Sequence, residues 1–278
     1  MGAATDCVPM ADKNIVDIDP SLNDVDKIDL CKPVTIEKIK NSLFSMDKHK
    51  SPGIDGYNVM FFQATWSTTS PSITTAVRDF FTTTSFLLKM QHILPNIINE
   101  SQSSFVKGRA IFDNIILSHE RVKGYNRKYI SPRCMIKIDL QKAYDYVEWP
   151  FIQCLLHLLG FPSRFVDWIM SCVMTSCVMT VSYVFNVNGD LTKPIKAKRG
   201  LRQGDPLSPY VVVLFMSYLR RCLGRLKNTS NFHFQPRCKK LNLTHVCFAV
   251  DLLLFSRGDS ESVREIYNAF QKFQRLRV

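Results

Sequence analysis

The sequence lacks the features that would place it in a membrane or in a disulfide-bonded secreted protein. Its longest apolar run, Tyr210–Met216, is far too short to span a bilayer, and no signal peptide is expected at the polar N-terminus. The nine cysteines are an odd number and contain no C-x-x-C pair, which favours free thiols in a reducing compartment over disulfides or a zinc site. We therefore expect an intracellular protein, in the nucleus or cytoplasm, without a membrane partner.

Acidic residues are also in short supply, because 24 Asp and Glu face 36 Lys and Arg, a formal net charge of +12. Such a charge favours a polyanionic partner. It is concentrated in three basic clusters, at Lys193–Arg202, Arg220–Lys227 and Arg237–Lys240, whereas residues 1–30 are acidic. Nucleic acid is the predicted partner, and a generic basic surface is the alternative.

The length of 278 residues allows one large domain or two ordinary ones. Residues 1–32 have no apolar periodicity and carry aspartates at positions that include 17, 19, 24, 26 and 29, so they are predicted to be a loose acidic arm. A short amphipathic helix is predicted next, from Val34 to a point before Lys48, with apolar residues at Ile36, Ile39, Leu43 and Phe44. The Pro- and Gly-rich loop of residues 48–56 could hold a phosphate through its backbone and lysines, or it could be an ordinary connector.

The rest of the chain alternates helical and strand patterns. In the predicted helix Ile111–Tyr125, the apolar residues Ile111, Ile115, Ile116 and Val122 are expected to share the inner face. An Asn-Gly turn predicts a hairpin over residues 181–198. Further helices are predicted at Phe61–Trp66, Ile73–Leu87, Phe151–Leu159, Ser163–Met170, Leu207–Leu226 and from Asp259 or Ser260 to Arg275.

Two carboxylates stand at predicted strand ends. Asp139 closes the strand Met135–Leu140, and Asp251 lies near the turn of a tight hairpin between two apolar runs. Alone, the hairpin is better interpreted as a buried turn with an acidic residue, because acidic turn residues are common. A basic, glycine-containing loop, Arg199–Pro209, precedes a helix and suits the phosphates of a nucleotide. If the carboxylates converge on one sheet, these are the parts of two-metal phosphoryl transfer with Mg²⁺.

In combination, five stretches resemble the reverse transcriptase domain of plant LINE-type (non-LTR) retrotransposons. They occur in family order from about Val34 to the C-terminus, and any one of them alone would be weak. The stretches are Lys50–Gly56, Gln102–Arg109, Lys137–Asp145, Arg199–Pro209 and Cys247–Phe255.

The resemblance implies roles residue by residue. Asp139 would be a metal-binding catalytic carboxylate, and Asp251 would be the second of two adjacent catalytic, metal-binding aspartates. Tyr144 would be the aromatic gate that rejects a ribonucleotide 2′-hydroxyl. The nucleotide and template would be bound by the loop that carries Arg199, Arg202, Gln203 and Gly204. The implied cofactor is Mg²⁺, two ions in the family, and the implied partners are an RNA template, a DNA primer and deoxynucleoside triphosphates.

The sequence departs from the family pattern at several places. The family hairpin reads Phe-Ala-Asp-Asp, but this chain has Val250 at the first aspartate position, and valine offers no oxygen ligand for Mg²⁺. Family members carry a longer fingers segment where this chain has only Leu87–Leu94. A five-residue tandem repeat occupies Ser171–Thr180, and no thumb or endonuclease is expected. These departures predict a copy with little or no activity.

The resemblance implies an α+β fold, a right-hand polymerase palm of antiparallel sheet and packed helices, with partial fingers and no thumb. Residues 33–130 would form the fingers and residues 131–278 the palm. The leading hypothesis is an RNA-directed DNA polymerase domain impaired by its departures. One alternative is a non-catalytic nucleic-acid-binding remnant, and another is a transposon reading frame that folds marginally.

Overall fold

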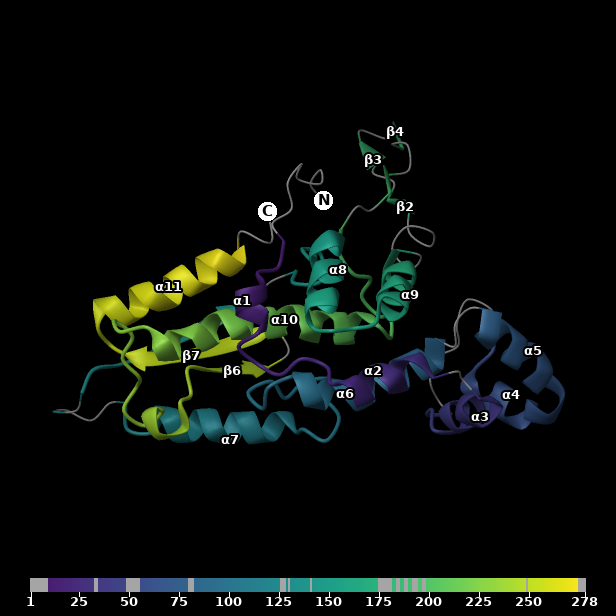
Figure 1. Cartoon of the computed structure of the whole chain (residues 1–278), viewed down its shortest axis with the longest axis horizontal. Coiled ribbons are helices and arrows are strands. Elements are labelled where there is room, and N and C mark those ends of the chain that lie inside the picture. The colour runs from purple at the N-terminus through teal and green to yellow at the C-terminus, as the bar shows by residue number, and fades with distance from the viewer. Residues whose placement is uncertain are drawn as a thin grey trace.

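The structure is a computed structural model in which helices surround a small antiparallel sheet, an α+β arrangement (Figure 1). It describes residues 10–32, 35–48, 56–79, 83–125, 129, 131–140, 142–174, 182–183, 186–187, 190–191, 195–196, 199–248 and 250–274. No helix among these residues is long and apolar enough to cross a membrane.

The helices are α1 (Lys13–Val16), α2 (Asp24–Cys31), α3 (Ile36–Phe44), α4 (Val59–Ala64), α5 (Trp66–Asp79), α6 (Thr83–Ile97), α7 (Ile111–Val122), α8 (Trp149–Leu158), α9 (Ser163–Met174), α10 (Ser208–Gly224) and α11 (Ser260–Gln274), with 3₁₀ turns η2 (Arg225–Asn228) and η3 (Lys239–Leu241). The strands are β1 (Arg133–Asp139), β2 (Ser182–Tyr183), β3 (Asn186–Val187), β4 (Asp190–Leu191), β5 (Ile195–Lys196), β6 (His245–Phe248) and β7 (Asp251–Arg257). The helix predicted at Ile73–Leu87 is wrong, because its described residues belong to two helices, α5 and α6.

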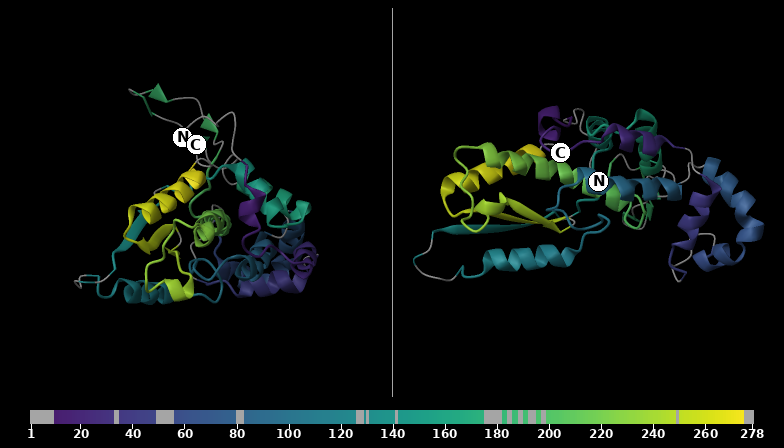
Figure 2. Two further views of the ribbon diagram at one scale, coloured as in Figure 1. Left: turned by 60° about the vertical axis from the view of Figure 1, so that its left-hand side comes forward. Right: turned by 60° about the horizontal axis from the view of Figure 1, so that its bottom comes forward.

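The main sheet has the order β1-β7-β6, with both pairs antiparallel. On one face, Ile136 and Ile138 of β1 and Leu252 and Leu254 of β7 join the main core, because alternate residues of a strand point the same way. The other face forms a smaller cluster against α7 and the segment before β6. The sheet therefore lies between α10 and α11 on one side and α7 on the other (Figures 1 and 2).

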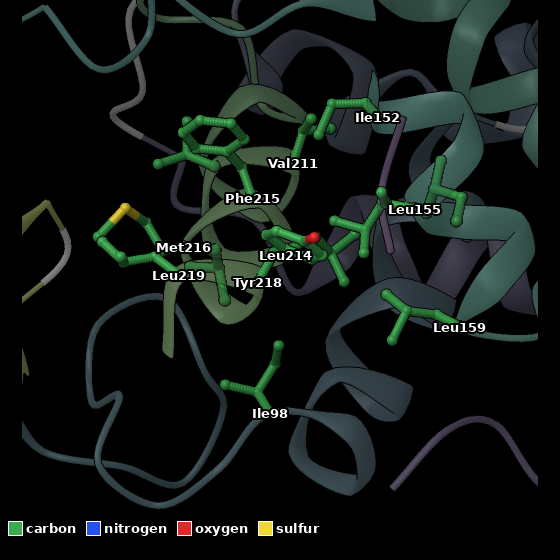
Figure 3. Packing of buried hydrophobic residues seen from close by; sticks show 14 of the residues in the cluster. Ile98, Ile152, Leu155, Leu159, Val211, Leu214, Phe215, Met216, Tyr218 and Leu219 are labelled. Atoms are coloured by element: carbon green, nitrogen blue, oxygen red, sulfur yellow. The ribbon is translucent and has the colours of Figure 1, made fainter. Parts of the chain in front are cut away.

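Helix α10 is the centre of the main core. Its residues from Val211 to Gly224 are all buried, which fits a helix that is apolar on every side. Phe151 of α8 packs edge-on against Phe215 and Tyr218 of α10, with ring centroids 5.8 Å and 5.2 Å apart. Figure 3 shows Phe215 and Tyr218 among the apolar side chains of the main core. Phe273 of α11 contacts Phe215 from the other side. The helix is thereby enclosed by α8 and α11.

The N-terminal segment is not the loose arm that the aspartates suggested. Residues 10–32 instead form α1 and α2, and Val16 and Leu30 are completely buried in the main core. Arg221 of α10 lies beneath the segment and donates to the carbonyls of Val16, Asp19 and Pro20. Arg220 forms an ion pair with Asp19. The segment is held by apolar burial and by charged donors that the sequence pattern does not reveal.

The same contacts remove part of the predicted basic surface. Arg220 and Arg221 were assigned to a basic cluster, but both side chains are buried, and burial lowers the pKa of each to about 10. The cluster Arg220–Lys227 therefore presents only its later members, such as Arg225 and Lys227, to solvent.

Helix α7 also differs from its prediction. Ile111, Ile115 and Ile116 are exposed rather than inward, and the buried side chains are the polar Asn114 and Ser118. Asn114 donates to the carbonyl oxygens of Ser101 and Cys247 at 3.1 Å each. Backbone groups at the edge of β6 thus determine which face turns inward, and apolar periodicity was misleading.

Most other local predictions are confirmed. Helices α3, α8, α9, α10 and α11 occupy the predicted stretches, and Asp259 caps α11 by accepting from the Ser262 backbone N–H at 2.8 Å. The pairs β2–β5 and β3–β4 confirm the hairpin of residues 181–198. Leu87–Leu94, the expected site of shortened fingers, lies inside the continuous helix α6. Residues 49–55 and 175–180 of the phosphate-loop and tandem-repeat predictions lie outside the described residues.

The buried arginine yields a stability prediction. Arg221→Ala should lower the free energy of unfolding by about 3 kcal/mol, because carbonyls that its guanidinium satisfies are left buried without a donor. The matched control is Arg225→Ala, an exposed arginine one turn further on, which should change it by less than about 0.5 kcal/mol. Urea denaturation measures both, and equal losses would contradict the role given to Arg221.

Candidate active site

Two aspartates face each other at one end of the sheet. Asp139 is the last residue of β1, Asp251 is the first of β7, and the register pairs them directly. Directly opposite residues of antiparallel strands point to the same face with Cβ atoms about 5 Å apart. Both therefore point away from the face that carries Ile138 and Leu252. The two strand-end carboxylates predicted from the sequence are brought together.

Their surroundings leave them available to a cation. Asp139 is exposed and Asp251 is half-buried, and among the described residues no ion pair joins either to a lysine, arginine or histidine. Like charges placed directly opposite each other in a sheet destabilise it. Such an arrangement is stabilised by a bound cation.

Val250 is a turn residue that directly precedes β7. Phe248 pairs with Asp251 across this turn, which confirms the predicted tight hairpin with Asp251 beside its turn. The Val250 side chain is half-buried and packs against the main core. The position next to the carboxylate pair thus carries an apolar group.

The turn after β1 is fastened to the loop that precedes α10. Leu201 donates its backbone N–H to Tyr144 O, and Gly200 donates to Val147 O, both at 2.8 Å. Trp149 Nε1 donates to Gly200 O at 2.7 Å. Tyr144 itself is half-buried against the main core, and burial raises the pKa of its phenol, which stays neutral at physiological pH. Tyr144 and the glycine-containing loop are therefore neighbours.

The four loop residues implied in nucleotide binding have different surroundings. Arg199 forms an ion pair with Glu148 at 3.2 Å and lies over the Tyr146 ring at 5.5 Å. Glu148 is only 1% exposed, so Arg199 neutralises a buried carboxylate. Arg202, Gln203 and Gly204 are exposed.

A segment that sequence reasoning did not assign to the site lies beside β6. Cys247 donates its backbone N–H to Ser101 O at 2.9 Å, and Gln102 pairs with Cys247 in a parallel bridge. Arg109, the last residue of the stretch Gln102–Arg109 that carries part of the family resemblance, donates to Gln102 O at 2.9 Å and to Ile98 O at 2.6 Å. Its guanidinium thus binds backbone carbonyls near the end of α6, and burial lowers its pKa.

His245 is buried beneath this segment. Its ring nitrogens lie 2.9 Å from Thr244 Oγ1 and 3.3 Å from Ser101 Oγ. Burial lowers the pKa of His245 to about 3, and the nearby Arg220 and Lys227 act in the same direction. The imidazole is therefore neutral at physiological pH.

The residues at the sheet end fit a hard divalent cation in part. Mg²⁺ binds oxygen ligands and commonly takes one or two carboxylates, with water and substrate phosphates completing its shell. Asp139 and Asp251 supply two such carboxylates. No cluster of three or more His, Cys, Asp or Glu exists among the described residues, and Val250 provides no oxygen.

Residues 72–277 match the family model described as reverse transcriptase (RNA-dependent DNA polymerase), nearly three quarters of the chain. The chain belongs to this family, and the resemblance seen in its motifs is confirmed.

The relatives are proteins of mobile elements. The chain is 25% identical over 239 residues to the transposon TX1 uncharacterized 149 kDa protein of Xenopus laevis. The aligned region covers 70% of this chain and 18% of the relative. It is 32% identical over 150 residues to a retrovirus-related Pol polyprotein from the type-1 retrotransposable element R2 of Popillia japonica, covering 52% of this chain and 22% of the relative. The chain thus spans about a fifth of the length of these relatives.

The loop contacts predict unequal effects of two glycine substitutions. Gly200 and Gly204 have φ values of +92° and +87°, but only a Cβ at Gly200 would meet backbone, 3.1 Å from Asp145 O. Gly204→Ala should lower the free energy of unfolding by about 1 kcal/mol through backbone strain alone. Gly200→Ala should lower the free energy of unfolding by at least about 1 kcal/mol more than Gly204→Ala does. Equal losses in chemical denaturation would show that the approach to Asp145 is unimportant.

His245 predicts a pH dependence of stability. Its pKa is lower in the folded state than its ordinary value of 6.5, so the unfolded chain binds the extra proton. The stability contributed by the neutral imidazole is complete above pH 6.5 and is lost as pH falls toward 3. Relative to His245→Asn, the unmodified chain should lose up to about 1.4 kcal/mol more per pH unit in this window. Parallel profiles from urea titrations at several pH values would contradict this.

Proposed function

We propose that this chain is the RNA-directed DNA polymerase domain of a non-LTR retrotransposon. Its ancestral reaction is the transfer of a deoxynucleotide to a primer 3′-hydroxyl on an RNA template. The observation that carries the proposal is the direct pairing of Asp139 with Asp251 at the end of the sheet. The family and the TX1 and R2 relatives support it.

The proposed chemistry follows from the residues at this end. Asp139 and Asp251 would hold Mg²⁺, which when bound would activate the primer hydroxyl and stabilise charge on the departing pyrophosphate. Exposed Arg202, Gln203 and Gly204 would contact the nucleotide and the template. The neutral, half-buried Tyr144 would limit the space beside the sugar and so exclude a 2′-hydroxyl. Arg199 would act indirectly, by holding Glu148 and with it the base of the loop.

The proposed division of the chain follows from the same assignment. Residues 131–278, which contain the sheet, α8 to α11 and both aspartates, would be the palm. Residues 33–130 would be partial fingers, whose helices α3, α4 and α5 project from the rest (Figure 1). The partners would be an RNA template, a DNA primer and deoxynucleoside triphosphates.

We further propose that this copy is catalytically impaired. Val250 sits beside the carboxylate pair with its side chain on the core and supplies no metal ligand. Loss of a metal-binding carboxylate lowers a rate by orders of magnitude, since each 1.36 kcal/mol of transition-state stabilisation is about tenfold.

The missing metal ligand at Val250 also favours a second function, which is nucleic-acid binding without catalysis. A chain that has lost a ligand but keeps exposed cations, among them Arg202, Lys239 and Lys240, can still bind nucleic acid without chemistry. Binding to an RNA–DNA hybrid should then weaken as salt rises, because each phosphate contact releases counterions. No binding at low salt would exclude this alternative.

Restoring the carboxylate tests the proposed function. Val250→Asp should raise primer extension on an RNA template at least about 100-fold above the unmodified chain in Mg²⁺ or Mn²⁺. The matched control is Val250→Asn, which has nearly the same shape but no charge and should give much less. Incorporation of labelled deoxynucleotide measures the rates.

Three results would count against the account. Robust synthesis by the unmodified chain would contradict the impairment. Full activity of Val250→Asp carrying Asp139→Asn would contradict the role of Asp139. If Val250→Asp does not increase primer extension, the inactivity would instead be attributed to the shortened fingers.

A further inference from the structure

Phe105 has an unusual backbone conformation. Its φ is +59°, in the left-handed region that bulky residues seldom adopt. The flanking residues Ser104 and Val106 are each 4% exposed, whereas Phe105 is 48% exposed. A strained backbone that turns an aromatic ring into solvent gains little for folding, and such strain concentrates at functional sites.

The turn that carries Phe105 is held firmly by its neighbours. Asn114 Nδ2 donates to Ser103 Oγ at 3.0 Å and to Ser101 O at 3.1 Å, and the Cys247 backbone N–H donates to Ser101 O. Arg109 donates to the Gln102 carbonyl on the same side of the turn. These bonds hold the backbone before Phe105 and the Arg109 side chain after it, and so brace the turn that carries the ring.

The turn lies at the carboxylate end of the sheet. Gln102 bridges Cys247 in parallel orientation, so the chain beyond Gln102 runs, like β6, toward the hairpin turn and Asp251. Figure 1 shows the chain between α6 and α7 passing beside the end at which β7 begins. The segment at Gln102 lies beside β6 and is therefore two strand spacings, about 10 Å, from β7. A nucleic-acid strand covers that distance in about three nucleotides, at 3.4 Å each.

We propose that the Phe105 ring is a stacking platform for a base of the nucleic-acid strand that approaches the carboxylate pair, an inference that rests on the proposed function. Exposed aromatic rings stack on bases of any sequence because every base has a π-face. Lys107, exposed two residues away, supplies a cation for the adjoining phosphate. The positive net charge of the chain favours the same ligand.

Protein is the competing kind of ligand. The outer face of α7 exposes Ile111, Phe112, Ile115 and Ile116, an apolar surface of the kind that proteins bury. Phe105 differs from these residues in three respects: its strained and braced turn, its neighbouring lysine and its place at the carboxylate end. These favour a base over an apolar protein side chain.

The chain offers a matched control for this position. Tyr129 is also an exposed aromatic residue with positive φ, +65°, but it precedes β1 and so lies toward the opposite end of the sheet from Asp139. Fluorescence anisotropy with a labelled DNA primer on an RNA template bearing a 5′ overhang measures binding. Phe105→Ala should raise Kd about tenfold, Phe105→Trp should preserve it, and Tyr129→Ala should leave it unchanged.

Salt dependence separates stacking from charge. Phe105→Ala should leave the slope of log affinity against log salt unchanged, because it removes no cation. Lys107→Ala should reduce that slope by about one. A changed slope for Phe105→Ala would contradict stacking as its role.

Phe105→Gly separates a binding role from a structural one. Glycine relieves the positive φ, so this variant should unfold at a Tm a few degrees higher while still binding the hybrid about tenfold more weakly. A lower Tm would make the ring a packing contact and overturn the proposal. Loss of a dimer in Phe105→Ala, seen by sedimentation, would assign the ring to a protein interface.

Failure of the stacking proposal can be distinguished from failure of the proposed function. If the unmodified chain binds the hybrid and Phe105→Ala binds equally well, the stacking proposal is wrong and the proposed function stands. If the unmodified chain does not bind the hybrid at low salt, both are wrong.

Discussion

The in-register pairing of β1 with β7 is the constraint on which the site depends. Seven consecutive residue pairs join the strands, from Arg133 with Arg257 to Asp139 with Asp251. A slip of one residue would turn Ile136 and Ile138 away from the main core and part the two aspartates. Apolar burial on one face therefore imposes a repulsive carboxylate pair on the other. The fold thus holds together the two carboxylates that we propose to be a cation site.

Many of the positive charges support the fold rather than the surface. Arg109 binds carbonyls near the end of α6, Arg199 neutralises the buried Glu148, and Arg220 and Arg221 hold the N-terminal segment on α10. A net charge of +12 thus overstates the charge available to nucleic acid. Exposed lysines and arginines, not the total, set the electrostatic attraction.

The sequence revealed those parts of the site that have a local signature. The hairpin around Asp251, the strand ending at Asp139 and the glycine loop each combine a strand or turn pattern with a special residue. Residues 10–32 were misjudged because their apolar positions follow no single period and their partners are buried arginines far away in sequence. The prediction of the inner face of α7 was wrong because the Asn114 side-chain amide donates to the Cys247 carbonyl at the edge of β6 and so turns that side of the helix inward. Long-range polar contacts of this kind produce no periodic pattern in the amino-acid sequence.

The central claim is that Asp139 and Asp251 form one cation site that Val250 leaves incomplete. Diffraction from crystals soaked in Mn²⁺, recorded at the manganese absorption edge, tests it most directly. The account predicts an anomalous peak within bonding distance of both carboxylates, stronger in Val250→Asp than in the unmodified chain. Carboxylates that bind no manganese even in Val250→Asp, or that point to different faces of the sheet, would contradict it.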